Sequence, residues 1–462
     1  MKILFIVYDN DSYTSYFPIG LAYLVAICQK HGHEVEIYQQ DINHYPDEHL
    51  TRYLDSRSFD FVGLSFIGGY YQYRKAVAIS KAVNASRQRP FFAVGGHGPS
   101  PEPEFFLHKL QADCVCIGEG EETVIDLLNC LDRRGDLSSI QGIAYREGGR
   151  VQVNEARPLI KNIDDLPLPA YSRFPIEVYR LLRASQGGPT DFVMPMLSGR
   201  GCTFACNFCY RLDKGFRPRS AEMIIEEMQL LQKDYGITYV IFADELLMSS
   251  AARTTSVCEA MIRANLNVRW SCQGRLNYAK GELLKLMERA GCRFINYGVE
   301  AFDDNSLRLM NKSLTTRQIT AGVEATLAAG ISPGLNVIFG NYGDDRSVLR
   351  KSVDFLLKYD DGAQLRTIRP VTPYPGSPLY YDAIAAGKLR DCEDFYENKH
   401  TNSDLMSVNF TKLTDAEFYE ALYEANTVLL ENYYKKQSQR NREILTNLYI
   451  KHDSNFRGFR RL

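Results

Sequence analysis

Three cysteines stand within eight positions near the middle of the chain, at Cys202, Cys206 and Cys209. This C-x3-C-x2-C spacing offers three thiolates to three corners of a four-iron cluster and leaves the fourth iron without a protein ligand. An iron left open in this way can bind a substrate or a cofactor. A closed zinc site needs a fourth Cys or His at short range, and none follows. The spacing therefore predicts a [4Fe–4S] cluster with one open iron.

Composition narrows the class of protein around this cluster. The 462 residues suffice for about two to four domains, and 45% hydrophobic with 24% charged residues is typical of a soluble globular protein. A net charge of −2 does not favour a polyelectrolyte partner. The sequence also lacks a basic patch that would argue for nucleic-acid binding. No apolar run approaches the roughly 20 residues of a membrane span. The 11 unevenly spaced cysteines and the absence of a secretory leader predict a reducing, cytoplasmic compartment.

The first 150 residues alternate short β-branched runs with helical stretches, which predicts a doubly wound parallel α/β sheet of the Rossmann type. Ligands of such sheets lie at the carboxyl ends of the strands, where Ser65, Gly95, Gly96 and Gly118 are expected. Each glycine alone is explained by a turn, but three similar strand ends favour a large flat ligand. The expected strands are residues 2–8, 34–39, 61–66, 91–96 and 114–118.

A second alternation begins after a proline-punctuated linker at 151–190. Six strand–helix units predict a partial βα barrel, whose chemistry belongs at the carboxyl ends of its strands. The cysteine loop follows the first of these strands, while Asp244, Arg275 and Glu300 end the second, third and fourth. The expected strands are residues 193–198, 239–243, 268–273, 293–299, 334–340 and 364–370.

The cysteine triad, with the aromatic Phe208 before its last Cys, resembles the signature of the radical S-adenosylmethionine (SAM) superfamily. The resemblance implies that the open iron chelates SAM and that reductive cleavage yields a 5′-deoxyadenosyl radical. The run from Tyr297 to Glu300 is similar to the family's G-x-E element, which implies that Glu300 binds the SAM ribose hydroxyls. By the same comparison Asp244 contacts the SAM amino group, and Arg275 is a candidate for its carboxylate. For each, a solvated strand-end charge is the alternative.

The N-terminal region resembles the cobalamin-binding domain that precedes the barrel in one branch of that superfamily. The similar elements are residues 18–24, 31–35, 94–97 and the Gly-Glu-Gly-Glu run at 118–121, which brings Glu119 into the predicted cofactor-binding set. The loop at 9–16 lacks the D-x-H-x-x-G motif whose His ligates cobalt in many relatives. Either cobalamin binds here without a His ligand, as in other members of this branch, or the domain has lost its cofactor.

Together these features predict four regions: a cobalamin-binding-like domain at 1–150, a linker at 151–190, a radical SAM barrel at 191–390 and a helical, substrate-side region at 391–462. The resemblance implies an enzyme that cleaves SAM and, with cobalamin, methylates an unactivated carbon of a small molecule. Its electron would come from a donor such as flavodoxin or ferredoxin. One alternative is ring formation, rearrangement or oxidation without methyl transfer. Another, of a different class, is a non-catalytic iron–sulfur redox or scaffold protein.

Overall fold

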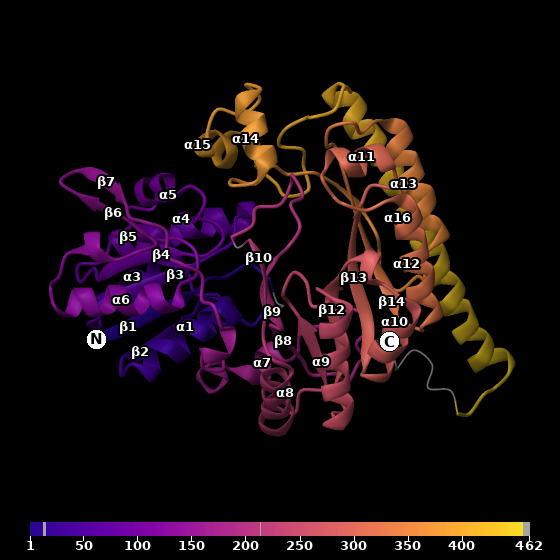
Figure 1. Cartoon of the computed structure of the whole chain (residues 1–462), viewed down its shortest axis with the longest axis horizontal. Coiled ribbons are helices and arrows are strands. Elements are labelled where there is room, and N and C mark those ends of the chain that lie inside the picture. Colours follow the sequence, from indigo (N-terminus) through magenta and orange to yellow (C-terminus); the bar gives the residue numbers. More distant parts are fainter. Residues whose placement is uncertain (13–14, 213, 456–462) are drawn as a thin grey trace.

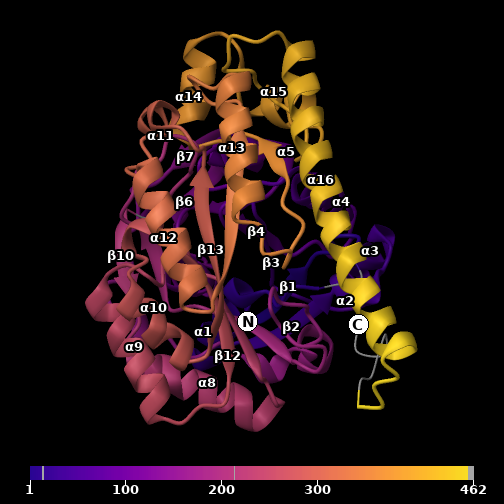
Figure 2. The ribbon, with the colours of Figure 1, turned by 90° about the vertical axis from the view of Figure 1, so that its right-hand side faces the viewer.

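The computed structural model describes residues 1–12, 15–212 and 214–455. Two α/β units, each built on a mainly parallel sheet, lie side by side, and a helical C-terminal segment runs across both (Figures 1 and 2). This architecture confirms the predicted α/β class, with a doubly wound sheet followed by a six-stranded parallel sheet. Residues 13–14 of the first loop and 456–462 of the C-terminal region lie outside the described ranges.

The first sheet has the strand order β2-β1-β3-β4-β5-β6-β7. Strands β1 to β5 are parallel, and the chain reverses direction across the sheet between β1 and β3, which is the switch point where such sheets bind ligands. The antiparallel β6–β7 hairpin, which the sequence did not predict, extends the far edge. The strands are Lys2–Val7, Glu34–Gln39, Phe61–Ser65, Phe91–Gly95, Cys114–Cys116, Ile143–Glu147 and Arg150–Val153 (β1–β7).

Helices cover both faces of this sheet because alternate side chains of its strands are apolar on both sides. In β1, Phe5 packs with α1 and α6, whereas Leu4 and Ile6 pack with α3, α4 and α5 on the other face. The helices are Ile19–Lys30 (α1), Gln40–Asn43 (α2), Asp47–Asp55 (α3), Tyr70–Asn84 (α4), Pro103–Lys109 (α5) and Glu121–Asp132 (α6).

The second sheet has six parallel strands in chain order, β8-β11-β12-β13-β14-β15, as expected of a partial barrel. The strands are Val193–Met196, Tyr239–Phe242, Arg269–Gly274, Cys292–Glu300, Ser332–Phe339 and Ile368–Pro370. Their outward side chains, Trp270 and Tyr297 among them, are buried beneath the helices. Those helices are Ala221–Tyr235 (α8), Ala251–Arg263 (α9), Gly281–Arg289 (α10), Asp304–Leu309 (α11), Thr316–Ala328 (α12) and Arg346–Lys358 (α13).

A short antiparallel hairpin interrupts the barrel just after its first strand. Strands β9 (Gly199–Cys202) and β10 (Gly215–Pro218) pair with each other and form a separate two-stranded sheet. Figure 1 shows this hairpin between the two large sheets. From the sequence we expected a loop directly after the first barrel strand. In the structure, Cys202 instead lies at the end of strand β9.

The C-terminal segment contains α14 (Pro378–Ala385), α15 (Cys392–Asp394) and the long helix α16 (Asp415–Leu445). Helix α16 packs along α13 and the edge strand β15, and it begins with a Thr414–Glu417 capping box. Its Asn426 side chain accepts from the Ile368 amide at 2.8 Å and donates to the Ile368 carbonyl at 3.0 Å. The amide group thus replaces the strand neighbour that β15 lacks. Within the described ranges, no helix is long and apolar enough to cross a membrane.

We predict that Asn426→Ala lowers the free energy of unfolding by about 1–3 kcal/mol, because it leaves both backbone groups of Ile368 without a partner. Urea unfolding followed by circular dichroism measures this change. The control Gln439→Ala alters an exposed residue of the same helix and is expected to stay within about 0.5 kcal/mol of wild type. Equal effects of the two substitutions would contradict the role given to Asn426.

Candidate functional site

The cysteine loop begins where strand β9 ends. Cys202 pairs in register with Gly215, and Cys206, with 6% of its surface exposed, lies in the loop that follows. Cys209 is exposed at the surface, yet desolvation by the atoms packed around its sulfur, and then the nearby Cys206 and Glu300, raise the pKa of its thiol to about 12. A neutral thiol is therefore favoured unless a cation lies beside it, and bound iron would supply that cation.

Asn207, between the second and third cysteines, fastens the loop to the barrel. Its amide accepts from and donates to the side chain of Asn341, which follows β14, at 2.9 and 3.1 Å. Its backbone N–H donates to the Met310 carbonyl at 3.0 Å, and its carbonyl accepts from the Leu379 N–H at 2.8 Å. The loop is thus tied to three separate segments of the chain. The sequence did not single out Asn207, because none of these partners is near it in sequence.

Glu300 ends β13 in a strained conformation. Its φ of +67° is in the left-handed region, and a bulge shifts the β13–β14 register between Gly298 and Glu300. The carboxylate accepts from the Lys312 ammonium at 2.7 Å, and both side chains are buried. A Cβ at Gly298 would lie 2.2 Å from the Glu300 carboxylate and 2.8 Å from the Lys312 nitrogen. The glycine of the G-x-E element therefore makes room for this ion pair.

Arg275 and Phe208 lie beside the same ion pair. The Arg275 guanidinium stacks 3.4 Å from the centre of the Phe204 ring and donates to the Lys312 carbonyl, and its buried Nε has no partner among the described residues. The Lys312 ammonium is 5.9 Å from the centre of the Phe208 ring. A buried, unpaired guanidinium N–H at a strand end fits an anionic ligand such as a carboxylate. Lys312 was not predicted from sequence.

Asp244 is buried at the end of β11 and holds the turn between β8 and β9. It accepts from the Ser198 amide at 2.7 Å and from the Ser198 hydroxyl at 2.9 Å. Burial raises the pKa of Asp244 to about 6, although the two bonds from Ser198 oppose the shift. Each carboxylate oxygen therefore already has a protein partner, which was not foreseen for a residue predicted to contact the SAM amino group.

The donor set fits a cluster better than a single metal ion. In the described part of the chain, no three His, Cys, Asp or Glu side chains converge on one point as a mononuclear metal site requires. Cluster cysteines each bind a different iron and so do not converge in this way. The three cysteines, at electrostatic range of one another and of Glu300, are compatible with that arrangement.

The carboxyl edge of the first sheet presents a surface suited to a flat ligand. Ser65, Gly95 and Gly96 lie at the adjoining ends of β3 and β4, and space beyond Gly118 is open where a Cβ would point. Large apolar side chains are exposed around this edge, and solvent exposure of such a group marks a surface that another molecule covers. They are Tyr16, Ile67 and Tyr71, at 66%, 56% and 59% exposure. These features fit the face of a corrin ring.

Glu119 points away from this surface, toward the barrel. Its carboxylate accepts from Arg200 at 2.7 Å and from Arg217 at 2.8 Å, both in the β9–β10 hairpin. It also accepts from the Ile160 amide at 2.8 Å. Burial opposes ionisation of Glu119, but the two arginines outweigh it and lower its pKa. The sequence placed Glu119 with the cofactor-binding residues, whereas the structure engages it with the other sheet's hairpin.

The carboxyl edges of the two sheets face each other at the cysteine loop. Tyr210, next to Cys209, makes an edge-to-face contact with His97 of the glycine-rich loop, with ring centres 5.9 Å apart. A Cβ at Gly376 would lie 2.4 Å from the Tyr210 ring and 2.6 Å from Pro101 of the first unit. The loop that carries the cysteines is therefore in contact with the loop that follows β4.

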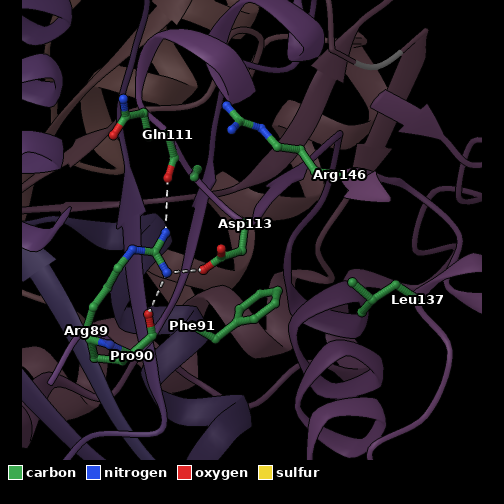
Figure 3. Close-up of a pocket in the computed structure, with 8 residues that line it drawn as sticks. Arg89, Pro90, Phe91, Gln111, Asp113, Leu137 and Arg146 are labelled. Atoms are coloured by element: carbon green, nitrogen blue, oxygen red, sulfur yellow. Dashed lines mark hydrogen bonds and ion pairs between the residues drawn. The ribbon is translucent and has the colours of Figure 1, made fainter. Parts of the chain in front are cut away.

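A surface hollow of about 510 Å³ lies elsewhere, at the amino ends of β4 and β5. Figure 3 shows Arg89 there, donating to Asp113 and to the carbonyls of Pro90 and Gln111. Arg146 also lines the hollow, and its guanidinium donates to the Leu107 carbonyl at 2.7 Å. Because both arginines already have partners and ligands of parallel sheets bind at the opposite edge, this hollow is not the site.

Comparison with known proteins agrees with this arrangement. Residues 7–128 match the B12 binding domain and residues 196–356 match the radical SAM superfamily. An uncharacterized methyltransferase of Pyrococcus horikoshii is 29% identical over 84% of each chain. The anaerobic magnesium-protoporphyrin IX monomethyl ester cyclase of Rubrivivax gelatinosus is 24% identical over 82% of this chain and 68% of its own.

The fold is also shared with a solved structure. The radical SAM methyltransferase TsrM of Kitasatospora setae, solved with cobalamin and a [4Fe–4S] cluster, superposes with a TM-score of 0.73 at 17% identity. The match covers 93% of this chain and 88% of that one. The chain therefore joins a B12-binding domain to a radical SAM domain, and its cofactors are a [4Fe–4S] cluster, SAM and cobalamin.

Proposed function

We propose that this enzyme transfers a methyl group to an unactivated carbon of a small molecule. The observation that carries the proposal is the contact between Tyr210 and His97, since it joins the cysteine loop to the corrin-binding edge. A substrate held between these edges has a radical source on one side and a methyl carrier on the other. The similarity to a methyltransferase over 84% of both chains supports this outcome.

We assign Cys202, Cys206 and Cys209 as the cluster ligands. When bound, the cluster and SAM supply a 5′-deoxyadenosyl radical that removes a hydrogen atom from substrate, and cobalamin supplies the methyl group. The protein would bind three of the four irons, leave the fourth open, and fix the position of the cysteine loop. The hydrogen bonds of Asn207 support the last of these tasks, because they tie the loop to three segments of the barrel side. A donor such as flavodoxin or ferredoxin would deliver the electron.

We assign the SAM-binding surface to Glu300, Arg275 and Phe208. Glu300 would accept from the ribose hydroxyls while the Lys312 ammonium, 2.7 Å away and also buried, orients its carboxylate. The unpaired Nε of Arg275 suits the SAM carboxylate, and the ring of Phe208 borders the loop. Asp244 acts through the Ser198 turn and sets the start of β9.

We place cobalamin against Ser65, Gly95, Gly96 and Gly118. Bound there, it would lie over the exposed apolar side chains at the switch point without a His from the loop after β1. The domain boundaries proposed are 1–150 and 191–390, with the 151–190 linker between them. The linker touches both units, since the Ala170 amide donates to the Ala22 carbonyl at 3.1 Å and the Tyr171 hydroxyl donates to Glu227.

Ring formation without methyl transfer is the second candidate. It keeps the same site and rests on the similarity to a magnesium-protoporphyrin cyclase. A non-catalytic iron–sulfur protein is less well supported, because it gives no reason for the strained, buried Glu300 beside the cysteines. The two experiments below separate the three functions.

For SAM binding, we expect Glu300→Gln to weaken SAM affinity by about tenfold or more, because it removes a charge-assisted hydrogen bond. Equilibrium dialysis with anaerobic protein measures the dissociation constant, and the iron content should not change. The control Glu282→Gln alters an exposed carboxylate on α10 and should leave the affinity unaltered. Wild-type affinity in Glu300→Gln would remove this residue from the SAM site.

For the reaction, we expect S-adenosylhomocysteine to form together with 5′-deoxyadenosine when the reduced, cobalamin-loaded enzyme turns over in cell extract. Liquid chromatography with mass spectrometry measures both products. The outcome of 5′-deoxyadenosine alone contradicts methyl transfer and favours the cyclase-like reaction. Cys206→Ala should abolish both products, since it removes one of three cluster ligands; if this variant kept full biological activity, the function would be non-catalytic.

A further inference from the structure

Two arginines stand directly opposite each other on the hairpin that carries Cys202. Arg200 of β9 pairs in register with Arg217 of β10, two residues before Cys202 pairs with Gly215. Like charges at facing positions of an antiparallel pair repel each other. The hairpin therefore needs negative charge close by in order to hold its register.

That negative charge comes from the other sheet. Glu119 and Glu121, where β5 leads into α6, bind the arginines at 2.7 Å (Arg200 with Glu119), 2.5 Å (Arg200 with Glu121) and 2.8 Å (Arg217 with Glu119). We call these four side chains the ion cluster. Glu119 and Glu121 are 81 and 79 residues from Arg200 in sequence, so the contacts join the B12-binding domain to the hairpin.

The ion cluster is largely shielded from water. Two positive and two negative side chains face one another, and their exposed fractions run from 6% to 17%. The Arg217 guanidinium also donates to the Ile160 carbonyl of the linker at 2.6 Å, and the Glu119 carboxylate accepts from the Ile160 amide. Because the pairs are buried, an arginine separated from its carboxylate would be left as an uncompensated buried charge, which is strongly destabilising.

The barrel holds the same hairpin at its other end. Asp244 binds Ser198, just before β9, and Arg253 donates to the carbonyls of Ser198 and Arg219 on either side of the hairpin. The hairpin is thus clamped by one domain at its base and by the other at Arg200 and Arg217. Its position depends on both domains at once.

We propose that Glu119 and Glu121 are positioning residues that set the distance between the iron–sulfur cluster and the corrin. This inference rests on the proposed function, in which Cys202 binds the cluster and the carboxyl edge of the first sheet binds cobalamin. The ion cluster connects these two places by a short path, from Gly118 at the corrin edge through Glu119 and Arg200 to Cys202. Displacements of about 1 Å matter to radical transfer between bound groups.

The direct test uses the double variant Glu119→Gln with Glu121→Gln in the full chain. Glutamine keeps the shape and removes the charge, so Arg200 and Arg217 repel each other. Hydrogen–deuterium exchange should then be about tenfold faster at the amides of β9 and β10 than in wild type. The matched control is Glu122→Gln, because Glu122 lies in the first turn of the same helix but pairs with Arg157 at 3.6 Å. Equal exchange in the double variant and the control overturns the proposal.

A second measurement reads the distance itself. Pulsed electron paramagnetic resonance between the reduced cluster and cob(II)alamin should give a narrow distribution in wild type and one about twice as wide in the double variant. The spectra of the cluster alone and of cob(II)alamin alone should not change. An unchanged distribution overturns the proposal, and so does loss of corrinoid with the cluster retained, because that result would put the carboxylates in the corrin site.

The two readouts separate this inference from the proposed function. Exchange at the hairpin needs neither cofactor nor substrate, so it tests the ion cluster even if methyl transfer is wrong. Product analysis tests methyl transfer even if the hairpin does not loosen. Should the double variant fail to fold, Glu121→Gln removes only the charge that faces Arg200 at 2.5 Å and should give a smaller acceleration confined to β9. No acceleration there overturns the proposal.

Discussion

The interaction on which this structure most depends is the buried set of ion pairs between Glu119, Glu121, Arg200 and Arg217. Buried ion pairs of this kind add little net stability, because desolvation offsets most of the attraction. Their effect here is geometric. They hold the β9–β10 hairpin at the ligand-binding edge of the first sheet, and the first strand of that hairpin ends at Cys202.

The candidate binding residues of the molecule lie at the carboxyl edges of two parallel sheets, and these edges face each other. Parallel strands leave polar side chains and backbone at those edges, so each sheet alone already has a binding edge. The cysteine loop lies between the edges and is bound from both sides, by Asn341 of the barrel and by the ring of His97. The backbone of Glu300 is strained, and this conformation places its carboxylate, paired with Lys312, beside that loop.

Much of the fold and part of the candidate site could be predicted from sequence. Apolar runs located all six barrel strands and the five parallel strands of the first sheet, because buried strands need continuous apolar side chains. The cysteine spacing and the G-x-E run could be predicted because their residues are close together in sequence. The partners were not: Glu119 meets Arg217 across 98 residues, and Lys312 reaches Glu300 from the turn after α11. The β9–β10 hairpin is short and glycine-rich, so no periodicity marked it.

The central claim is that one chain holds an open-iron cluster and a corrin at facing edges. Cofactor content after anaerobic purification with added hydroxocobalamin tests it most directly. We predict about four irons and one cobalamin per chain in wild type, and loss of the iron with retention of cobalamin in Cys206→Ala. Wild-type protein that bound iron but retained no corrinoid would contradict the account.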